Sequence, residues 1–228
     1  MPRAWLWGSP HDIEHRHFIW SDGARTCDWD RLAAVPIADN QREYDIQHRL
    51  LDIVAHTMMI TCGRLKREDF SSVCFDEHQR VLVLRNSKAH SLADLRGQKV
   101  CSTSGATSIA KIVAANAILV PVTYWTDCLM LLQQGDVAAI STDDCILKGL
   151  ESLDPRTELR GAPVTNEPYG LAINNHPDFV ASVNAVLEQL RTDGQWSASY
   201  AHWIGTPGSG RGIQELTGGG NVDQEAGS

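Results

Sequence analysis

Short apolar runs and amphipathic stretches alternate along most of this chain. Runs rich in branched residues predict buried strands at residues 51–55, 79–84, 98–101, 120–124, 137–140 and 168–173. Stretches with apolar residues at helical spacing predict helices at residues 41–50, 91–97, 109–117, 127–134, 145–150 and 177–193. Strands that alternate with helices in this order indicate an α/β fold with largely parallel sheets.

Polar residues and glycines mark the ends of several predicted helices. Ser91 is placed to cap the helix at 91–97, and Asp127 to cap the helix that Gly135 ends. Residues 85–90 are polar and turn-like, which favours a linker. After the last long helix a helical face continues, and its aromatic residues are expected in the core: Trp196, Tyr200 and Trp203.

The two ends of the chain carry weaker patterns. Residues 1–34 combine scattered tryptophans with the closely spaced histidines His11, His15 and His17. No helix or strand framework presents these histidines together, so we expect poorly ordered chain there and no metal site. Residues 207–228 are dominated by glycine and polar residues, which cannot build a core, and we expect a disordered tail.

The composition limits the classes of function. A chain of 228 residues with a formal net charge of -8 can form one large domain or two small lobes. The negative charge argues against nucleic acid or an anionic membrane as a partner of the whole surface, but it leaves room for a local basic pocket. No apolar run is long enough to cross a bilayer, and the first residues do not read as a signal peptide. We therefore expect a chain that is cytoplasmic, already processed or without its natural start.

Six cysteines are spread along the chain, and no pair has the Cys-x-x-Cys spacing of a zinc or redox site. Six is many for a cytosolic protein and few for a disulfide scaffold. Cys101 ends a predicted strand and Cys128 begins a predicted helix, so a disulfide can join them. Separate buried thiols are the alternative, and the sequence does not choose between the two.

Candidate binding chemistry begins at Arg64. This arginine follows the predicted strand at 51–55, and in open α/β sheets ligands bind outside the carboxyl ends of strands. A guanidinium holds a carboxylate with two parallel hydrogen bonds, which a lysine cannot copy. A solvated surface charge is the alternative, because Lys66 and Arg67 are also basic. Arg64 becomes a binding candidate only together with two further sites.

These two further polar strand ends lie in the middle of the chain. A hydroxyl-rich turn at 102–108 separates a predicted strand from a predicted helix, where backbone N–H groups and hydroxyls can hold an anion. The turn lacks the Gly-Lys-Ser/Thr ending of a P-loop, and an ordinary helix cap is the alternative. Asp143 follows another strand and suits an ammonium group, although it or Asp144 can also cap the next helix. Arginine, hydroxyls and carboxylate together complement a zwitterion, and no nucleophile–base pair accompanies them.

With these sites in view, the chain resembles the polar amino-acid family of extracytoplasmic solute-binding proteins, family 3. It is most similar to the actinobacterial glutamine- and glutamate-binding lipoproteins of that family. The segments that carry the resemblance are Ile60–Ser71, Ala93–Ser108, Trp125–Leu129, Val137–Leu147, Glu167–Gly170, Arg191–Trp196, Tyr200 and Trp203–Gly205. Each segment alone is weak evidence for the resemblance, but their order and spacing over roughly residues 36–205 are specific for this family.

The resemblance implies a two-lobe, type II periplasmic-binding-protein-like α/β fold with two hinge strands, whose lobes close on a ligand in the cleft between them. It implies an atypical segment at 1–34, lobe 1 at 35–86 and 174–206, lobe 2 at 87–173, and a tail at 207–228. Family members begin with a first strand and a Gly-Phe-Asp segment that residues 1–34 do not recognisably contain. We therefore expect lobe 1 to be incomplete, without its first strand.

The resemblance also implies roles for individual residues. Arg64 matches the arginine that binds the α-carboxylate, and Asp143 matches the aspartate that binds the α-ammonium group. The lobe 1 ligand loop further contains Thr61 and Met59, the latter where the family usually has threonine. Arg49 stands where a helix-ending glycine is common. The lobe 2 ligand turn is matched by Thr103, Ser104, Ala106, Thr107 and Ser108.

The implied function is that of a substrate-binding component of an ABC importer, which binds a polar L-amino acid of the glutamate or glutamine class without turnover. The implied partners are the amino acid and a membrane permease at an extracytoplasmic location, although no signal peptide or lipobox is visible. We expect a monomer that uses no cofactor or metal and binds no nucleic acid. An enzyme such as a dehydratase on the same fold is one alternative, with His90 and Glu167 as the nearby acid–base candidates. A remnant that binds nothing is the other.

Overall fold

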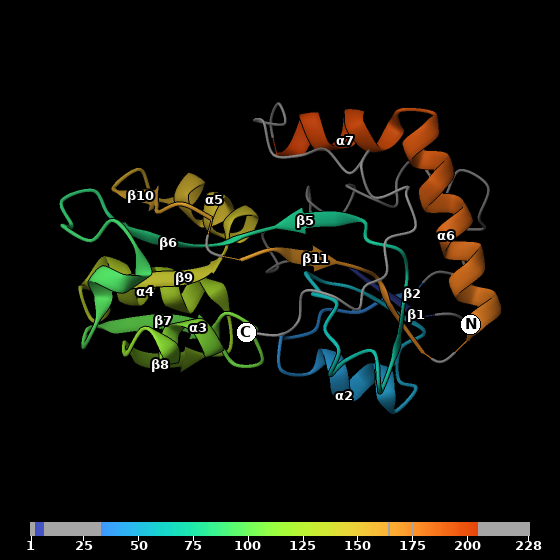
Figure 1. Ribbon diagram of the computed structural model, residues 1–228, viewed down its shortest axis with the longest axis horizontal. Helices are drawn as coiled ribbons and strands as arrows, with labels where there is room; N and C mark the ends of the chain where they lie inside the picture. Colours follow the sequence, from blue (N-terminus) through green and yellow to red (C-terminus); the bar gives the residue numbers. More distant parts are fainter. Residues whose placement is uncertain (1–2, 7–32, 164, 175, 205–228) are drawn as a thin grey trace. The chain divides into compact units, whose positions relative to one another are not determined.

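The computed structural model describes residues 3–6, 33–163, 165–174 and 176–204, and the chain divides into two compact units. The first unit comprises Met1–Val35, Ile46–Asp76 and Tyr169–Ser228, and the second comprises Pro36–Asp45 and Glu77–Pro168. The chain thus enters the second unit at Pro36–Asp45, which we expected in lobe 1, and enters it again from Glu77 to Pro168, where we expected crossings after residues 86 and 173. Figure 1 shows the order of the elements along the chain. The expected tail at 207–228 and the three histidines lie outside the described residues.

The first unit contains a five-stranded sheet in the order β2-β1-β3-β12-β4. Strand β1 (Arg3–Leu6) pairs in parallel with β2 (Ala33–Ala34) and β3 (Ile53–Ala55). Strand β12 (Ala172–Ile173) pairs antiparallel with both β3 and β4 (Asp69–Phe70). The expectation that this lobe lacks its first strand is therefore wrong, because Arg3–Leu6 supplies a strand beside β3.

Two helices follow this sheet in the first unit: α6 (Pro177–Thr192) and α7 (Gln195–Trp203). Helix α6 packs on β4 and buries Leu187 and Leu190. Helix α7 buries none of its residues, so its aromatic side chains are only half-buried rather than part of the core as predicted: Trp196, Tyr200 and Trp203. Two of them pack on Phe75, whose ring centroid lies 5.4 Å from that of Tyr200 and 6.3 Å from that of Trp196.

Helix α2 (Arg42–Gln47) is shorter than the helix predicted at 41–50. Soon after it, Arg49 has a φ of 57°, in the left-handed region. That conformation ends many helices and is adopted most easily by glycine. The chain therefore makes the helix-ending turn here without the glycine that usually permits it.

The second unit contains another five-stranded sheet, in the order β10-β6-β9-β7-β8. Its strands are β6 (Gln79–Leu84), β7 (Lys99–Thr103), β8 (Ile118–Val122), β9 (Ala139–Asp143) and β10 (Thr157–Arg160). Strand β7 is parallel to β8 and β9, whereas β6 is antiparallel to β9 and β10. Both five-stranded sheets are thus mixed, and the prediction of largely parallel sheets holds for only part of each.

The second unit has four helices in its described part: η4 (Leu92–Leu95), α3 (Ile109–Ala114), α4 (Trp125–Gln134) and α5 (Asp144–Leu153). The Ser91 cap is confirmed, although η4 is a 3-10 helix. Asp127 does not cap α4 as predicted; it lies inside the first turn, where its carboxylate accepts the backbone N–H of Tyr124 at 3.3 Å. Gly135 ends α4 in the left-handed conformation, as predicted, with a φ of 80°.

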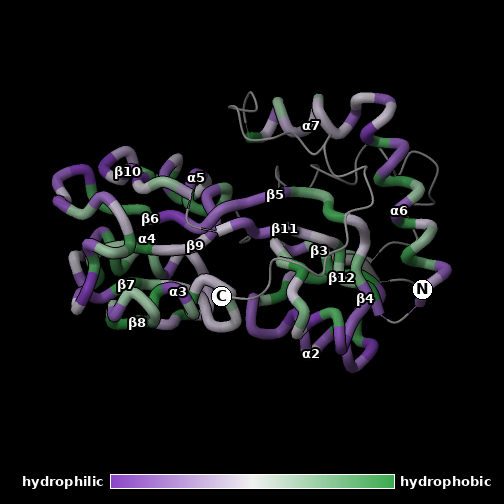
Figure 2. The backbone as a smooth tube through the Cα atoms, in the orientation of Figure 1, coloured by the Kyte–Doolittle hydropathy of each residue, from purple (hydrophilic) through white to green (hydrophobic). Residues whose placement is uncertain are grey.

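The core of the second unit forms where η4 and α3 cover the sheet. Its fully or nearly fully buried members are Val81, Val83, Ala89, Leu92, Leu95, Val100, Ile112 and Ala139. Figure 2 shows a hydrophobic β8 and a hydrophilic loop after β6, although β8 buries none of its residues fully. No helix in the described part of the chain is both long enough and apolar enough to cross a membrane.

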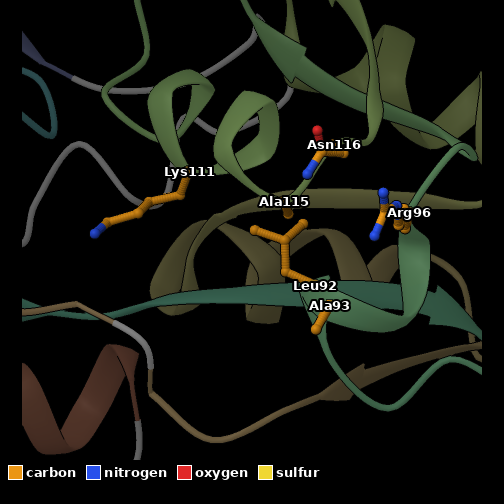
Figure 3. Close-up of a pocket in the computed structure, with 6 residues that line it drawn as sticks. All are labelled: Leu92, Ala93, Arg96, Lys111, Ala115 and Asn116. Carbon is orange, nitrogen blue, oxygen red and sulfur yellow. The ribbon is translucent and has the colours of Figure 1, made fainter.

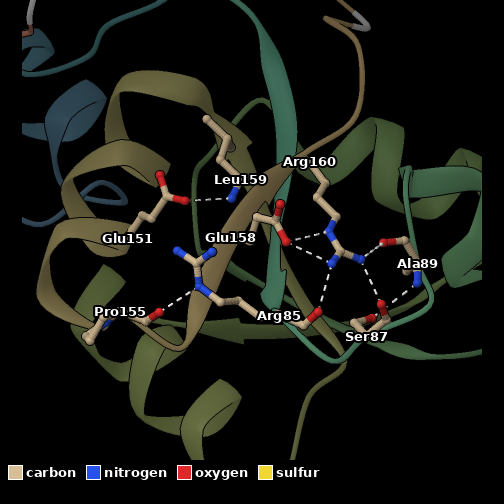
Figure 4. Close-up of polar contacts among 8 residues, drawn as sticks. All are labelled: Arg85, Ser87, Ala89, Glu151, Pro155, Glu158, Leu159 and Arg160. Atoms are coloured by element: carbon tan, nitrogen blue, oxygen red, sulfur yellow. Dashed lines mark hydrogen bonds and ion pairs between the residues drawn. The ribbon is translucent and has the colours of Figure 1, made fainter.

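The polar loop after β6 lies inside the second unit and does not act as the linker we expected at 85–90. Arg160 on β10 donates to the carbonyls of Ser87 (2.7 Å), Ala89 (3.1 Å) and Arg85 (2.9 Å) (Figure 4). The guanidinium of Arg160 is also paired with Glu158 at 2.8 Å. One side chain therefore fixes the loop against the edge of the sheet.

A third, two-stranded sheet consists of β5 (Phe75–Glu77) and β11 (Glu167–Tyr169). Both strands contain a point at which the chain passes from one unit to the other. The single strand predicted at 168–173 is therefore two strands, β11 and β12, which belong to different sheets. Gly170 separates them and donates its N–H to the carbonyl of Met58 at 3.1 Å.

Candidate functional site

The Arg64 loop, residues 56–68, follows β3 in the first unit. The Thr61 hydroxyl accepts the backbone N–H of Arg64 at 3.1 Å, and a helical turn begins there with a bond of 2.9 Å from the Leu65 N–H to the Thr61 carbonyl. The Arg64 residue is only 4% exposed, and its Nη1 donates to the carbonyl of Met59 at 2.9 Å. Arg64 is therefore not the solvated surface charge of the alternative interpretation.

The structure brings the three predicted residues of this loop together. Arg64 bonds to Thr61 through its backbone and to Met59 through its side chain. A guanidinium carries five donors in a planar fork, which suits a carboxylate. Glu68, which the sequence reasoning missed, lies one helical turn further on; it is 2% exposed and accepts a hydrogen bond from Gln47 at 3.2 Å.

The hydroxyl turn, residues 103–108, links β7 to α3 in the second unit. Its hydroxyls bond to other parts of the chain. Thr103 donates to the carboxylate of Asp39, and Thr107 donates to Glu167 at 3.1 Å. Ser108 shares a hydrogen bond of 2.9 Å with Ser102 and makes no cap bond with its side chain, although it occupies the cap position of α3. Helix α3 has six residues, which is shorter than predicted, and the N–H groups of Ile109 and Ala110 in its first turn already donate to the carbonyls of Ala106 and Thr107.

Gln79 connects the hydroxyl turn to the end of β9. This side chain is fully buried, and its Nε2 donates to the carbonyl of Ser108 at 3.2 Å and to the hydroxyl of Ser141 at 3.0 Å. Ser141 in turn donates to the carbonyl of Arg80 at 2.9 Å. Asp143 ends the same strand as Ser141. The hydrogen bonds of Gln79 therefore connect the hydroxyl turn to the strand that carries Asp143.

Asp143 is 5% exposed and occupies the cap position of α5 without a cap bond from its side chain. A second acid lies close by, because Glu77 accepts the backbone N–H of Cys145 at 3.0 Å. Burial, followed by a hydrogen bond to Asp144 and the charge of that residue, raises the pKa of Glu77 to about 10. Burial and the neighbouring acids therefore favour the protonated form of Glu77, which reduces the negative charge around Asp143.

A disulfide joins Cys101 to Cys128, with their Cα atoms 5.5 Å apart. Of the two alternatives that the sequence left open, the structure thus selects the bridge for this pair. It ties β7 to α4 just before the hydroxyl turn. The remaining described cysteines are free thiols: Cys62, Cys74 and Cys145.

A groove of about 430 Å³ lies between η4 and α3, and none of the predicted ligand residues lines it (Figure 3). Leu92 lies at its centre, and two cations line it, Arg96 and Lys111. The arginine lies beside Asn116, whereas the lysine extends in the opposite direction, so the two charges do not converge on one point (Figure 3). The described residues contain no group of three or more His, Cys, Asp or Glu side chains that could hold a metal ion.

The two acid–base candidates for an enzyme have different surroundings. His90 is exposed, and its backbone N–H donates to Asp94 at 3.0 Å. Glu167 is 2% exposed and accepts the hydroxyl of Thr107. Sequence reasoning missed the residues that organise the second unit's site: Asp39, Arg42, Glu77, Gln79 and Ser141. The spacing of Asp39 and Arg42 near a helix start was the one usable signal, because residues three apart can pair there.

Comparison with known proteins agrees with this two-unit α/β architecture, which is the type II fold of periplasmic binding proteins. The family of bacterial extracellular solute-binding proteins, family 3, matches residues 24–206. The chain belongs to this family.

Two named relatives are about one third identical to this chain over the aligned residues. The ABC transporter glutamine-binding protein GlnH of Bacillus subtilis (strain 168) is 34% identical over 163 residues, which cover 70% of this chain and 60% of the relative. The glutamate-binding protein GluB of Corynebacterium efficiens is 32% identical over 167 residues, 68% of this chain and 57% of the relative. The chain thus spans about three fifths of the length of these curated relatives.

Solved structures share the fold. An ancestral arginine-binding protein bound to arginine has a TM-score of 0.72 at 26% identity and covers 76% of this chain and 80% of its own. The solute receptor for L-cysteine of Neisseria gonorrhoeae has a TM-score of 0.80 at 19% identity, with 89% of each chain covered. The second likeness shows the fold alone.

Proposed function

We propose that this chain is the substrate-binding component of an ABC importer and that its ligand is a polar L-amino acid of the glutamate or glutamine class. The observation that carries the proposal is the position of Arg64 in the loop after strand β3. Its guanidinium is buried and donates a hydrogen bond to the carbonyl of Met59. The printed names of the relatives, a glutamine-binding and a glutamate-binding protein, support the ligand class.

Each proposed ligand group has a chemical partner among the described residues. Arg64 takes the α-carboxylate through two parallel hydrogen bonds, with Met59 and Thr61 shaping its loop. Asp143 takes the α-ammonium group. The hydroxyl turn contributes the remaining polar contacts through Thr103, Ser104, Ala106, Thr107 and Ser108. The partner of the loaded chain is a membrane permease at an extracytoplasmic location, and we propose that the chain acts as a monomer.

Calorimetric titration of the chain with L-glutamine, L-glutamate and L-aspartate tests the proposal. Arg64→Ala should weaken the binding of the preferred amino acid by a hundredfold or more, since two charge-assisted hydrogen bonds contribute about 3 kcal/mol or more. Lys66→Ala is the matched control, because this exposed neighbour in the same loop should leave the affinity within about twofold.

Further variants and measurements distinguish the proposed function from an enzyme and from a chain that binds nothing. Arg64→Lys keeps the charge but lacks the fork, so it should recover only a small part of the lost affinity. An unchanged affinity in Arg64→Ala would reject Arg64 as the ligand group. Product formation from the titrated amino acid, followed by NMR in the same sample, would indicate an enzyme. A folded chain that binds none of the three amino acids would reject the proposed ligand class.

A further inference from the structure

We call residues 38–42 of the second unit, which lie beside the hydroxyl turn, the latch. Ala38, Asp39 and Arg42 are buried in this segment, whereas Asn40 and Gln41 are exposed. Asp39 is 6% exposed and Arg42 is 3% exposed, whereas Thr103 is completely buried. The Thr103 hydroxyl donates to the Asp39 carboxylate across 64 residues of chain. A carboxylate of the chain itself is therefore bound at the turn to which the proposed function assigns part of the ligand.

Arg42 completes this arrangement. Its Nη1 lies 3.2 Å from the other oxygen of Asp39, and its Nε donates to the backbone carbonyl of Asp39 at 3.0 Å. Its Nη2 also donates to the carbonyl of Gly105 at 3.4 Å. The backbones meet closely, because a Cβ on Gly105 would lie 3.0 Å from the Cα of Asn40. The latch thus fits the turn with a charge pair, a hydroxyl bond and direct backbone packing.

A threonine hydroxyl has a single proton to donate. While Thr103 donates it to Asp39, no ligand group can accept it. A ligand oxygen at the same place would also lie close to the negative charge of Asp39, which like-charge repulsion disfavours. Bonds from a hydroxyl to a carboxylate are roughly twice as strong as neutral ones, so the chain's own carboxylate is a strong competitor.

We infer that the latch is an autoinhibitory contact: Asp39 acts as an internal ligand of Thr103, and an amino acid must displace it from the hydroxyl turn. This inference rests on the proposed function. It predicts that the measured affinity is lower than the turn would give without the latch, because part of the binding free energy is spent on releasing Asp39.

Titration of the full chain with L-glutamine tests the inference. Asp39→Asn keeps the shape but replaces the carboxylate by a weaker, neutral acceptor, and it should bind about tenfold more tightly than the natural sequence. Thr103→Val removes the contested donor, so adding Asp39→Asn to Thr103→Val should change the affinity by less than about twofold. Asp136→Asn, at an exposed position of the same unit, is the charge-matched control and should leave the affinity unchanged.

Loss of a buried partner of Arg42 can prevent folding, so two further measurements accompany the single variant. The pair Asp39→Asn and Arg42→Gln removes both charges and should also bind more tightly. In the natural sequence, saturating L-glutamine should speed amide hydrogen exchange in residues 38–42, because the latch is released. Unchanged or weaker binding by folded Asp39→Asn, or slower exchange of the latch with ligand, would overturn the inference. If neither the natural sequence nor any variant binds an amino acid, the proposed function itself fails.

Discussion

The Arg64 loop of the first unit and the hydroxyl turn of the second unit are held in different ways. In the Arg64 loop two hydrogen bonds of the arginine are local: Arg64 bonds to Met59 five residues earlier and to Thr61 three residues earlier. The hydroxyl turn depends on distant partners, with Thr103 bonded to a residue 64 positions away and Thr107 to one 60 positions away. The Arg64 loop has distant partners as well, since Met58 accepts the N–H of Gly170 and Glu68 accepts a hydrogen bond from Gln47. The hydroxyls of the turn, however, bond to distant residues, whereas these two bonds of Arg64 stay within its loop.

Their covalent support differs as well. The disulfide between Cys101 and Cys128 lies just before the hydroxyl turn, whereas the described cysteines of the first unit, Cys62 and Cys74, are free. A structure made of distant contacts gains most from a cross-link, because each contact depends on the relative positions of several elements. The comparison therefore predicts that the hydroxyl turn is the more sensitive of the two to changes elsewhere in the chain.

Of the substitutions that test this comparison, removal of the disulfide should lower the free energy of unfolding most. The bridge closes a loop of 27 residues, for which the chain-entropy estimate is about 3–4 kcal/mol. We expect the variant with Cys101→Ala and Cys128→Ala to lose about that much free energy of unfolding, measured by urea denaturation. Cys62→Ser, at an exposed free thiol, is the control and should change it by less than about 0.5 kcal/mol. Equal denaturation curves with and without reductant in the natural sequence would contradict the expectation.

A smaller effect is expected at Gly105, where the turn meets the latch. This residue has a φ of 88°, and a Cβ there would lie 3.0 Å from the backbone of Asn40. Gly105→Ala should therefore lower the free energy of unfolding by about 2–3 kcal/mol, through backbone strain and crowding together. Thermal and urea unfolding measure it.

Gly135 provides the matched control for this substitution. It has a similar φ of 80°, but a Cβ there would meet nothing within 4 Å. Gly135→Ala should therefore cost only the strain of the left-handed conformation, about 1 kcal/mol. If the two alanine variants lose the same stability, the close approach of the latch to the turn makes no contribution.

Local signals predicted much of the fold from the sequence. Strand β6 has the bounds expected for it, Gln79–Leu84, because a continuous apolar run bounded by polar residues leaves little choice. The end of helix α4 at Gly135 was also predicted correctly from the sequence. Strand β1 was missed because four residues carry little periodicity and their partner, β3, is far along the chain. The division of residues 168–173 at Gly170 into β11 and β12, which belong to different sheets, was missed because only the pairing of distant strands determines it.

The residues of the candidate site also differ in how far the sequence could predict their contacts. Arg64 became a candidate only together with the two other polar strand ends and the family resemblance, and the structure brings Arg64, Met59 and Thr61 together. In the hydroxyl turn the sequence identified the hydroxyls but not their acceptors, since Asp39 and Glu167 are brought there by the fold. Sequence reasoning accordingly treated Thr103 as available to a ligand, whereas in the structure it donates to the latch.

The smallest expected effect concerns Glu77, whose pKa of about 10 in the folded chain compares with an ordinary value of 4.5. Between these two values the unfolded chain is ionised at this position while the folded chain keeps its proton, so stability contributed by Glu77 is complete below pH 4.5 and falls as the pH rises toward 10. Glu77→Gln should flatten this decline, so it should be more stable than the natural sequence at pH 9 and differ less from it at pH 5.

Melting curves from pH 5 to pH 9 measure this effect, and Glu77→Ala separates the charge from the hydrogen bond. The alanine variant cannot accept the Cys145 N–H, so it should be less stable than Glu77→Gln at every pH, yet its pH profile should be equally flattened. A decline with pH that persists unchanged in both variants would assign the titration to another group. A flattened profile would show that a neutral Glu77 lies beside Asp143, which would leave Asp143 as the carboxylate better able to attract a ligand's ammonium group.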